Sequence, residues 1–128
     1  MSSITVIHSD DAPKAVGPYS QAVVAGGVLY ASGQIGLVPG EGKLVADDVE
    51  SQAEQVTKNL TAVLSEAGVS LTGILKVNIF LTDMGDFPRV NEIYAAWLGE
   101  HRPARATVAV AALPLGARVE MDLVASID

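Results

Sequence analysis

Apolar residues recur along the chain with two different periods, and these periods divide it into predicted helices and strands. Within residues 48–67 the apolar positions follow spacings of three, four and one, which places them on one stripe. Residues 86–101 show a similar pattern, with Tyr94 and Trp97 on the apolar side. The sequence therefore predicts two amphipathic helices.

Residues beside each run predict where the helices begin and end. Asp47, with Glu50 three residues further on, fits a capping box for the first helix. Asp86 is the expected cap of the second helix, whose first turn tolerates Pro88. Gly68 is expected to end the first helix in a left-handed conformation.

Shorter apolar runs predict six strands, joined in one place by Gly26-Gly27, a typical hairpin link. The predicted order is three strands, a helix, a strand, a helix and two strands. Right-handed crossovers would place both helices on the same face of one mixed sheet. We therefore expect a single α+β domain over residues 1–128. The predicted strands are residues 4–7, 21–25, 28–32, 74–82, 105–113 and 118–127.

Two helices can cover only one face of such a sheet. Residues 105–113 are apolar on both sides, with Val108 and Val110 on one and Ala109 and Ala111 on the other. Strands of this kind are normally buried on both faces. We expect an oligomer in which the uncovered face packs against other copies. The alternative is a monomer whose own loops cover that face.

Charge and composition narrow the function classes. The chain carries 15 acidic and 8 basic residues, for a net charge of -7, which disfavours nucleic-acid binding. It has no cysteine, and His8 and His101 lack the spacing of metal ligands, so neither a thiol nucleophile nor a metal is expected. No secretory signal or bilayer-spanning run is recognisable, so we expect a cytoplasmic protein without a membrane partner.

Arg105 is the first candidate for binding a ligand. It follows Pro103-Ala104, where the proline stops the second helix and fixes the start of the next strand. A guanidinium held in this way can bind a carboxylate through two parallel hydrogen bonds. The alternative is an ordinary surface arginine paired with a nearby acid.

Glu120 is the candidate acid or base, because strand alternation places it and Asp122 on one face. The alternative is a solvated strand face. If the last two strands form a hairpin turning near Leu115, Glu120 lies opposite about residue 110 and Arg105 opposite about residue 125. Both could then serve one site only in a strongly curved sheet or, as we favour, across a subunit boundary.

Four further residues are candidates for lining a small-molecule site. Tyr19 follows a Gly-Pro turn and could offer its hydroxyl or be an ordinary tyrosine at the edge of the core. Ser32 and Gly33 end a predicted strand. Asn91 is a polar residue among apolar neighbours in the second helix, where it lies on the surface or makes a buried hydrogen bond.

These segments together resemble the Rid/YjgF family of reactive intermediate deaminases. Each stretch alone is weakly specific, but the ordered set covers nearly the whole chain. The stretches are Ala12-Pro13, Gly17 to Ala22, Ser32 to Ile35, Gln52, Asn59-Leu60, Ala67-Gly68, Lys76-Val77, Asp86-Phe87, Val90-Asn91, Tyr94, Pro103 to Arg105, Leu113-Pro114 and Val119-Glu120.

The resemblance implies a chorismate-mutase-like fold, a six-stranded mixed sheet with two helices on one face, and a homotrimer with sites between subunits. It implies hydrolysis of 2-imino and enamino acids, such as 2-iminopropanoate and 2-iminobutanoate, to 2-oxo acids and ammonia without a cofactor. By that analogy Arg105 binds the substrate carboxylate, Glu120 positions or activates water, and Tyr19 shapes the pocket. Ser32, Gly33 and Asn91 match positions near the substrate.

One departure concerns the residues after the arginine. Relatives often carry Ser-Cys there, whereas this chain has Ala106-Thr107. The backbone of Thr107 can still bind substrate, but regulation through a thiol does not carry over. The alternatives to a deaminase are a non-catalytic module that binds small carboxylates or acts as a chaperone, and a ribonuclease or translation inhibitor.

Overall fold

Residues 3–127, which the computed structural model describes, form six strands and two α-helices in the predicted order. Three short 3₁₀ turns precede β4, α2 and β6. The elements are β1 (Thr5–Ile7), β2 (Ala22–Ala25), β3 (Val28–Ile35), α1 (Val49–Glu66), β4 (Ile74–Leu81), α2 (Phe87–Leu98), β5 (Ala104–Ala109) and β6 (Val119–Ser126).

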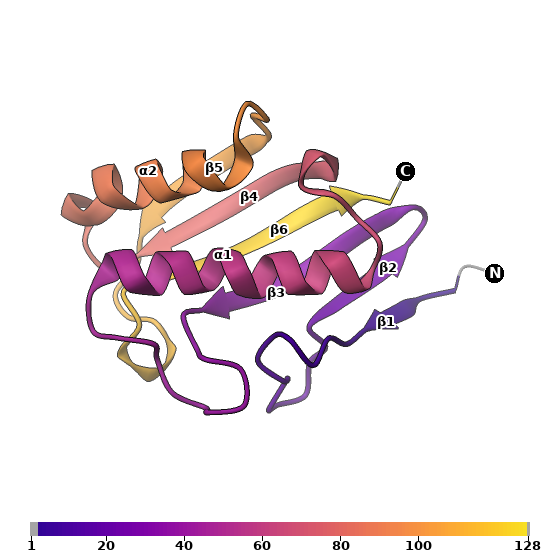
Figure 1. Cartoon of the computed structure of the whole chain (residues 1–128), viewed down its shortest axis with the longest axis horizontal. Helices are drawn as coiled ribbons and strands as arrows, with labels where there is room; N and C mark the ends of the chain where they lie inside the picture. Colours follow the sequence, from indigo (N-terminus) through magenta and orange to yellow (C-terminus); the bar gives the residue numbers. More distant parts are fainter. Residues whose placement is uncertain (1–2, 128) are drawn as a thin grey trace.

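The strands form one sheet in the order β1-β2-β3-β6-β4-β5. β4 and β5 pair in parallel, and the other neighbours pair antiparallel. Both helices lie on the same face of this sheet, with α1 over its middle and α2 beside it (Figure 1). The predicted α+β class and the placement of the helices are therefore confirmed.

The predicted hairpin between the last two strands is wrong. β4 lies between β5 and β6 and pairs with both, so β5 is an edge strand. The strand also ends at Ala109 rather than at residue 113, and the turn Pro114–Gly116 leads back to β6. Because β5 follows a helical crossover, it joins β4 in parallel and leaves the antiparallel edge of β4 for β6.

The helix ends differ from the prediction in detail. Asp48, not Asp47, caps α1, because its carboxylate accepts a hydrogen bond from the Ser51 amide at 2.8 Å. Asp86 does occupy the cap position of α2, but its side chain binds the Arg89 guanidinium instead of a helix amide. Gly68 follows α1 with φ +74°, as predicted.

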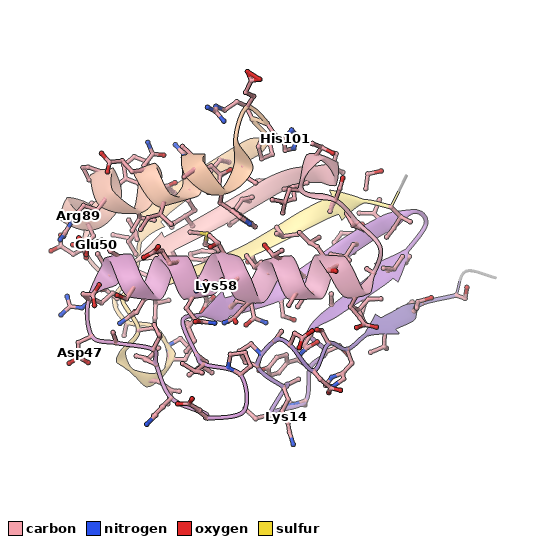
Figure 2. All side chains as sticks on the ribbon, viewed as in Figure 1. Lys14, Asp47, Glu50, Lys58, Arg89 and His101 are labelled. Carbon is pink, nitrogen blue, oxygen red and sulfur yellow. The ribbon has the colours of Figure 1, made fainter. Side chains whose placement is uncertain are left out.

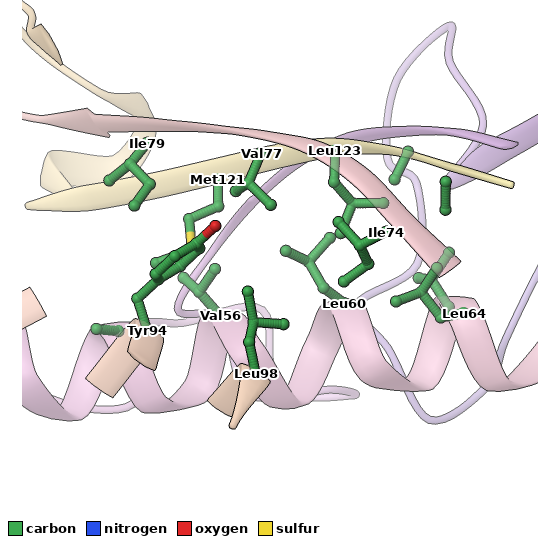
Figure 3. Packing of buried hydrophobic residues seen from close by; sticks show 14 of the residues in the cluster. Val56, Leu60, Leu64, Ile74, Val77, Ile79, Tyr94, Leu98, Met121 and Leu123 are labelled. Atoms are coloured by element: carbon green, nitrogen blue, oxygen red, sulfur yellow. The ribbon is translucent and has the colours of Figure 1, made fainter. Parts of the chain in front are cut away.

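The core lies between the sheet and the two helices. The stripe of α1 is buried, including Val56 and Leu60, and it packs with Tyr94 of α2 against the inner face of the sheet (Figure 3). Strand alternation predicts that Leu75 lies on the same face as the buried Val77, but Leu75 is 49% exposed, because the pairing of β4 with β6 is irregular between Ile74 and Lys76. Ile74 fills the core position in its place.

The polar sides of the helices face outward. Arg89 of α2 approaches Glu50 of α1, with 3.5 Å between Nη1 and Oε2, which joins neighbouring ends of the two helices (Figure 2). Neither this contact nor other exposed ion pairs add much stability. Within residues 3–127 no helix is long and apolar enough to cross a membrane.

The face of the sheet opposite the helices, here called the open face, carries apolar side chains that this chain leaves uncovered. Val6 is 62%, Tyr30 50% and Val108 47% exposed, and the register places all three on that face. Near its middle, Asn78 Nδ2 donates to Asp122 Oδ1 at 2.8 Å. The open face therefore combines exposed apolar side chains with a polar pair near its middle.

Gly36 allows β3 to approach α1 closely. A Cβ added there would lie 2.9 Å from both the Cα and the carbonyl oxygen of Gln52. Gly36→Ala must therefore separate two backbones, and we expect the free energy of unfolding to fall by about 1–3 kcal/mol, measured by urea titration. Gly17→Ala, whose nearest contact is 3.4 Å, is the control. Equal midpoints for the two variants would contradict this packing.

Candidate functional site

A cavity of about 970 Å³ lies at the end of β3. The N-terminal loop, the loop after β3 and the turn before β6 enclose it, and Lys14 marks the N-terminal loop in Figure 2. Three of the predicted site residues line it, namely Tyr19, Gly33 and Glu120. The sequence therefore identified residues that meet in space although they are far apart in the chain.

Glu120 is a half-buried carboxyl group in the wall of this cavity. A Cβ on Gly33 would lie 2.5 Å from Glu120 Oε2, so a side chain at position 33 would displace the carboxyl group. Burial raises the pKa of Glu120, and the negative charge of Asp122 raises it further. A carboxyl group with a raised pKa can exchange a proton closer to neutral pH than an ordinary glutamate.

Tyr19 and Ser32 are coupled through the backbone of the Tyr19 turn. The Tyr19 amide donates to the Gly17 carbonyl at 2.8 Å, which makes the turn tight, and the Tyr19 ring is 51% exposed. The Ser32 hydroxyl donates to the Ser20 carbonyl at 2.6 Å. Ser32 does not line the cavity. Its hydrogen bond instead holds the turn that carries Tyr19 against β3.

Arg105 belongs to a second group of residues, on the edge strand β5 and on α2. Its Nη1 donates to Asn91 Oδ1 at 2.6 Å, and its Cζ lies 5.2 Å and 5.1 Å from the ring centroids of Phe87 and Tyr94. Among residues 3–127, no carboxylate lies within 4.0 Å of its guanidinium. The alternative of a surface arginine paired with a local acid therefore finds no support in the described part of the chain.

Thr107 lies two residues after Arg105 and on the same side of β5. Its hydroxyl is buried and has no hydrogen-bond partner among the described residues. Because β5 is the edge of the sheet, one side of its backbone is free of strand partners. Backbone groups near Thr107 are thus available for an external ligand.

One chain does not bring Arg105 and Glu120 together. Arg105 is in register with Val77, a core residue, so its side chain leaves the sheet on the helix face. Glu120 is in register with Phe80, three residues further along β4, and alternation places it on the open face. The cation and the carboxyl group therefore leave opposite faces of the sheet.

The structure also reveals three buried amides that hold the loops around the cavity. The Gln21 side chain binds Ser9 and the Pro13 carbonyl, and Asn59 Nδ2 donates to the carbonyls of Ile35 and Leu37. Gln52 donates to the Ala46 carbonyl and accepts from the Arg118 amide. The three amides thereby fix the backbone at Ser9, Pro13, Ile35, Leu37, Ala46 and Arg118.

No role was predicted for these amides, although the sequence carries a signal for one. Gln52, Val56, Asn59 and Val63 share one side of α1, so two amides lie on the apolar stripe. A polar residue on a buried stripe must find a partner, since burying it unbonded costs about 1–3 kcal/mol. That position marks it as a loop anchor.

The fold and the two candidate groups define a class of protein. It is an α+β protein in which a guanidinium, Arg105, and a carboxyl group with a raised pKa, Glu120, lie on opposite faces of the sheet. The profile of the family described as "Endoribonuclease L-PSP" matches residues 9–127. The human 2-iminobutanoate/2-iminopropanoate deaminase is 46% identical over 120 residues, which cover 94% of this chain and 88% of that protein.

Solved structures agree with this assignment. A protein of the conserved Rid family, YyfA from Yersinia pestis, is 47% identical with a TM-score of 0.95 and covers 97% of this chain and 99% of its own. TdcF from E. coli, solved with bound serine, is 38% identical with a TM-score of 0.90 and covers 95% and 98%. The chain belongs to the Rid/YjgF family and has its chorismate-mutase-like fold.

The raised pKa of Glu120 predicts a stability that depends on pH. A carboxyl group whose pKa is raised in the folded state binds its proton more tightly there than in the unfolded state. The protein therefore loses stability as pH rises from the ordinary pKa of 4.5 to the raised pKa. Glu120→Gln removes this loss. We therefore expect the variant to gain stability over the parent protein as pH rises above 4.5, in urea titrations at fixed protein concentration.

Glu92→Gln is the control for this titration, because it neutralises an exposed carboxylate on α2. Its stability relative to the parent is expected to change little over the same window. A Glu120→Gln curve parallel to that of the parent protein at every pH would refute the raised pKa.

Proposed function

We propose that the protein hydrolyses reactive 2-imino and enamino acids, of the 2-iminopropanoate and 2-iminobutanoate type, to 2-oxo acids and ammonia. The observation that carries this proposal is Arg105, a guanidinium without a carboxylate partner among residues 3–127. On a chain with net charge -7, it is suited to binding the carboxylate of a small acid.

The chemistry needs few protein groups. Arg105 holds the substrate carboxylate so that C2 is oriented toward water. Water adds to the C=N bond, whose electron pair moves to nitrogen as nitrogen takes a proton. Glu120 accepts and returns protons during this addition. The carbinolamine then forms the C=O bond as ammonia leaves, so water is consumed and no oxidant or reductant takes part.

The relatives support this substrate class. The human relative bears the name of a deaminase of 2-iminobutanoate and 2-iminopropanoate, and the TdcF structure contains serine, a small amino acid. Both substrates and serine carry one carboxylate and one nitrogen on the adjacent carbon. The proposed pairing of Arg105 with the carboxylate and Glu120 with the reacting centre suits that pattern.

We also propose that the site is completed between copies of the chain, in a homotrimer. Arg105 and Glu120 leave opposite faces of the sheet, and the apolar side chains of the open face are uncovered in one chain. In this assembly Arg105 of one copy faces the cavity of Tyr19, Gly33 and Glu120 in the next. The same contact would cover the open face.

A ribonuclease is the alternative that the printed description of the family suggests. Binding a polyphosphate backbone requires several basic groups, whereas this chain has 8 basic against 15 acidic residues. A single guanidinium on an acidic protein favours a small acid over RNA. A module that binds small acids without catalysis shares the Arg105 contact and differs only in lacking turnover.

Replacing the guanidinium tests the proposed role directly. Arg105→Ala should lower kcat/KM by about 100-fold, because two charge-assisted hydrogen bonds are worth about 3 kcal/mol. The assay generates 2-iminobutanoate enzymatically and follows its conversion to 2-oxobutanoate. Arg102→Ala, at an exposed arginine bound to backbone carbonyls, is the matched control. Full activity of Arg105→Ala would exclude a role of Arg105 in binding the substrate carboxylate. If the parent protein binds 2-oxobutanoate but shows no turnover, it is a non-catalytic binding module.

Mixed oligomers test whether Arg105 and Glu120 come from different chains. Arg105→Ala and Glu120→Gln should each be inactive alone, yet their co-expressed mixture should recover about a quarter of the parent activity, because random assembly places both intact residues at one boundary in four. Mixing Arg105→Ala with the double variant is the control and should recover nothing. A mixture as inactive as the control would place both residues in one chain's site.

A further inference from the structure

One side of α2 is dedicated to the Arg105 side chain. Phe87, Asn91 and Tyr94 are spaced by four and three residues, so they form a stripe along the helix. All three contact the guanidinium: Asn91 through a hydrogen bond of 2.6 Å, and the two rings with centroids 5.2 Å and 5.1 Å from Cζ. The long side chain of Arg105 is therefore fixed by three contacts.

The stripe holds a cation without neutralising it. The amide oxygen of Asn91 is an uncharged acceptor and takes a single N–H of the five that a guanidinium offers. The rings attract the positive charge through their faces and take no N–H donor at all. Enough donors thus remain for a two-point bond to a carboxylate, and the full charge remains as well.

Tyr94 is itself held firmly. Its ring is 6% exposed, and it meets Trp97 edge-on with centroids 6.2 Å apart. Burial raises the pKa of the Tyr94 hydroxyl, so the ring stays neutral beneath the guanidinium. The buried ring of Tyr94 and the directional hydrogen bond from Arg105 to Asn91 together restrict the tilt and the rotation of the guanidinium plane.

We propose that Asn91 is a positioning residue, which with Phe87 and Tyr94 orients the Arg105 guanidinium and leaves its charge and its outward N–H groups free for the substrate carboxylate. Asn91 does not need to touch the substrate, in contrast to the role in substrate binding that the family resemblance suggests. The substrate part of this inference rests on the proposed function, whereas the orientation of Arg105 does not.

Two substitutions at position 91 separate positioning from simple structural support. Asn91→Asp keeps the shape but introduces a carboxylate that competes for Arg105, so we expect KM for 2-iminobutanoate to rise by about fivefold, the size of an exposed ion pair, with kcat nearly unchanged. Asn91→Ala should raise KM less, by about twofold. Glu92→Gln, on the neighbouring exposed position of α2, is the control. If Asn91 only supported the fold, the isosteric Asn91→Asp would be the milder change.

The orientation of Arg105 can be measured without substrate. In NMR spectra of the arginine side chains, the two Nη groups of Arg105 should give separate signals in the parent protein. The reason is that Phe87, Asn91 and Tyr94, which together form a clamp, slow rotation of the guanidinium. The signals should merge in Asn91→Ala. Merged signals already in the parent protein, or separate signals in Asn91→Ala, would overturn the clamp. An inactive parent protein with separate signals would instead refute the proposed function and leave the clamp standing.

Discussion

Side chains of a β-strand alternate between the two faces of its sheet, and this geometry decides where the charged groups of the site lie. β4 pairs on one side with β5 and on the other with β6, so Val77 and Phe80 fix the faces from which Arg105 and Glu120 project. Those faces are opposite. The two groups therefore cannot pair with each other within one chain, so the guanidinium does not lower the pKa of Glu120, which burial and the charge of Asp122 raise.

The two halves of the site are supported in different ways. The cavity half is built from loops, whose positions depend on the buried amides Gln21, Gln52 and Asn59 bonding to backbone groups. The guanidinium half stands on regular elements, the start of β5 and one side of α2. Residues on regular elements are held more precisely than those on loops. Arg105 is thus the more rigid partner and Tyr19, with half of its surface exposed, the more adaptable one.

Local signals predicted the elements well, and non-local pairing explains most of the errors. The apolar stripe of α1 and the left-handed Gly68 depend on neighbouring residues alone, and both are confirmed. The hairpin between the last strands was wrong because adjacency in sequence does not reveal that β4 inserts between β5 and β6. The exposure of Leu75 results from an irregular register between β4 and β6, which cannot be predicted from the apolar period of the sequence. For the site, residue types and spacing proposed Tyr19, Gly33 and Glu120, but their meeting in one cavity needed the structure.

The electrostatic setting makes the contacts of Arg105 informative. Arg89 pairs with the carboxylates of Asp86 and Glu50, whereas Arg102 and Arg118 bind backbone carbonyls. Arg105 instead contacts an amide and two aromatic rings, all uncharged. Such contacts hold a cation with little loss of its attraction for an external anion. In the proposed assembly, the carboxylate that completes this environment is that of the substrate, which explains how a protein with a net negative charge can bind an acid at one point.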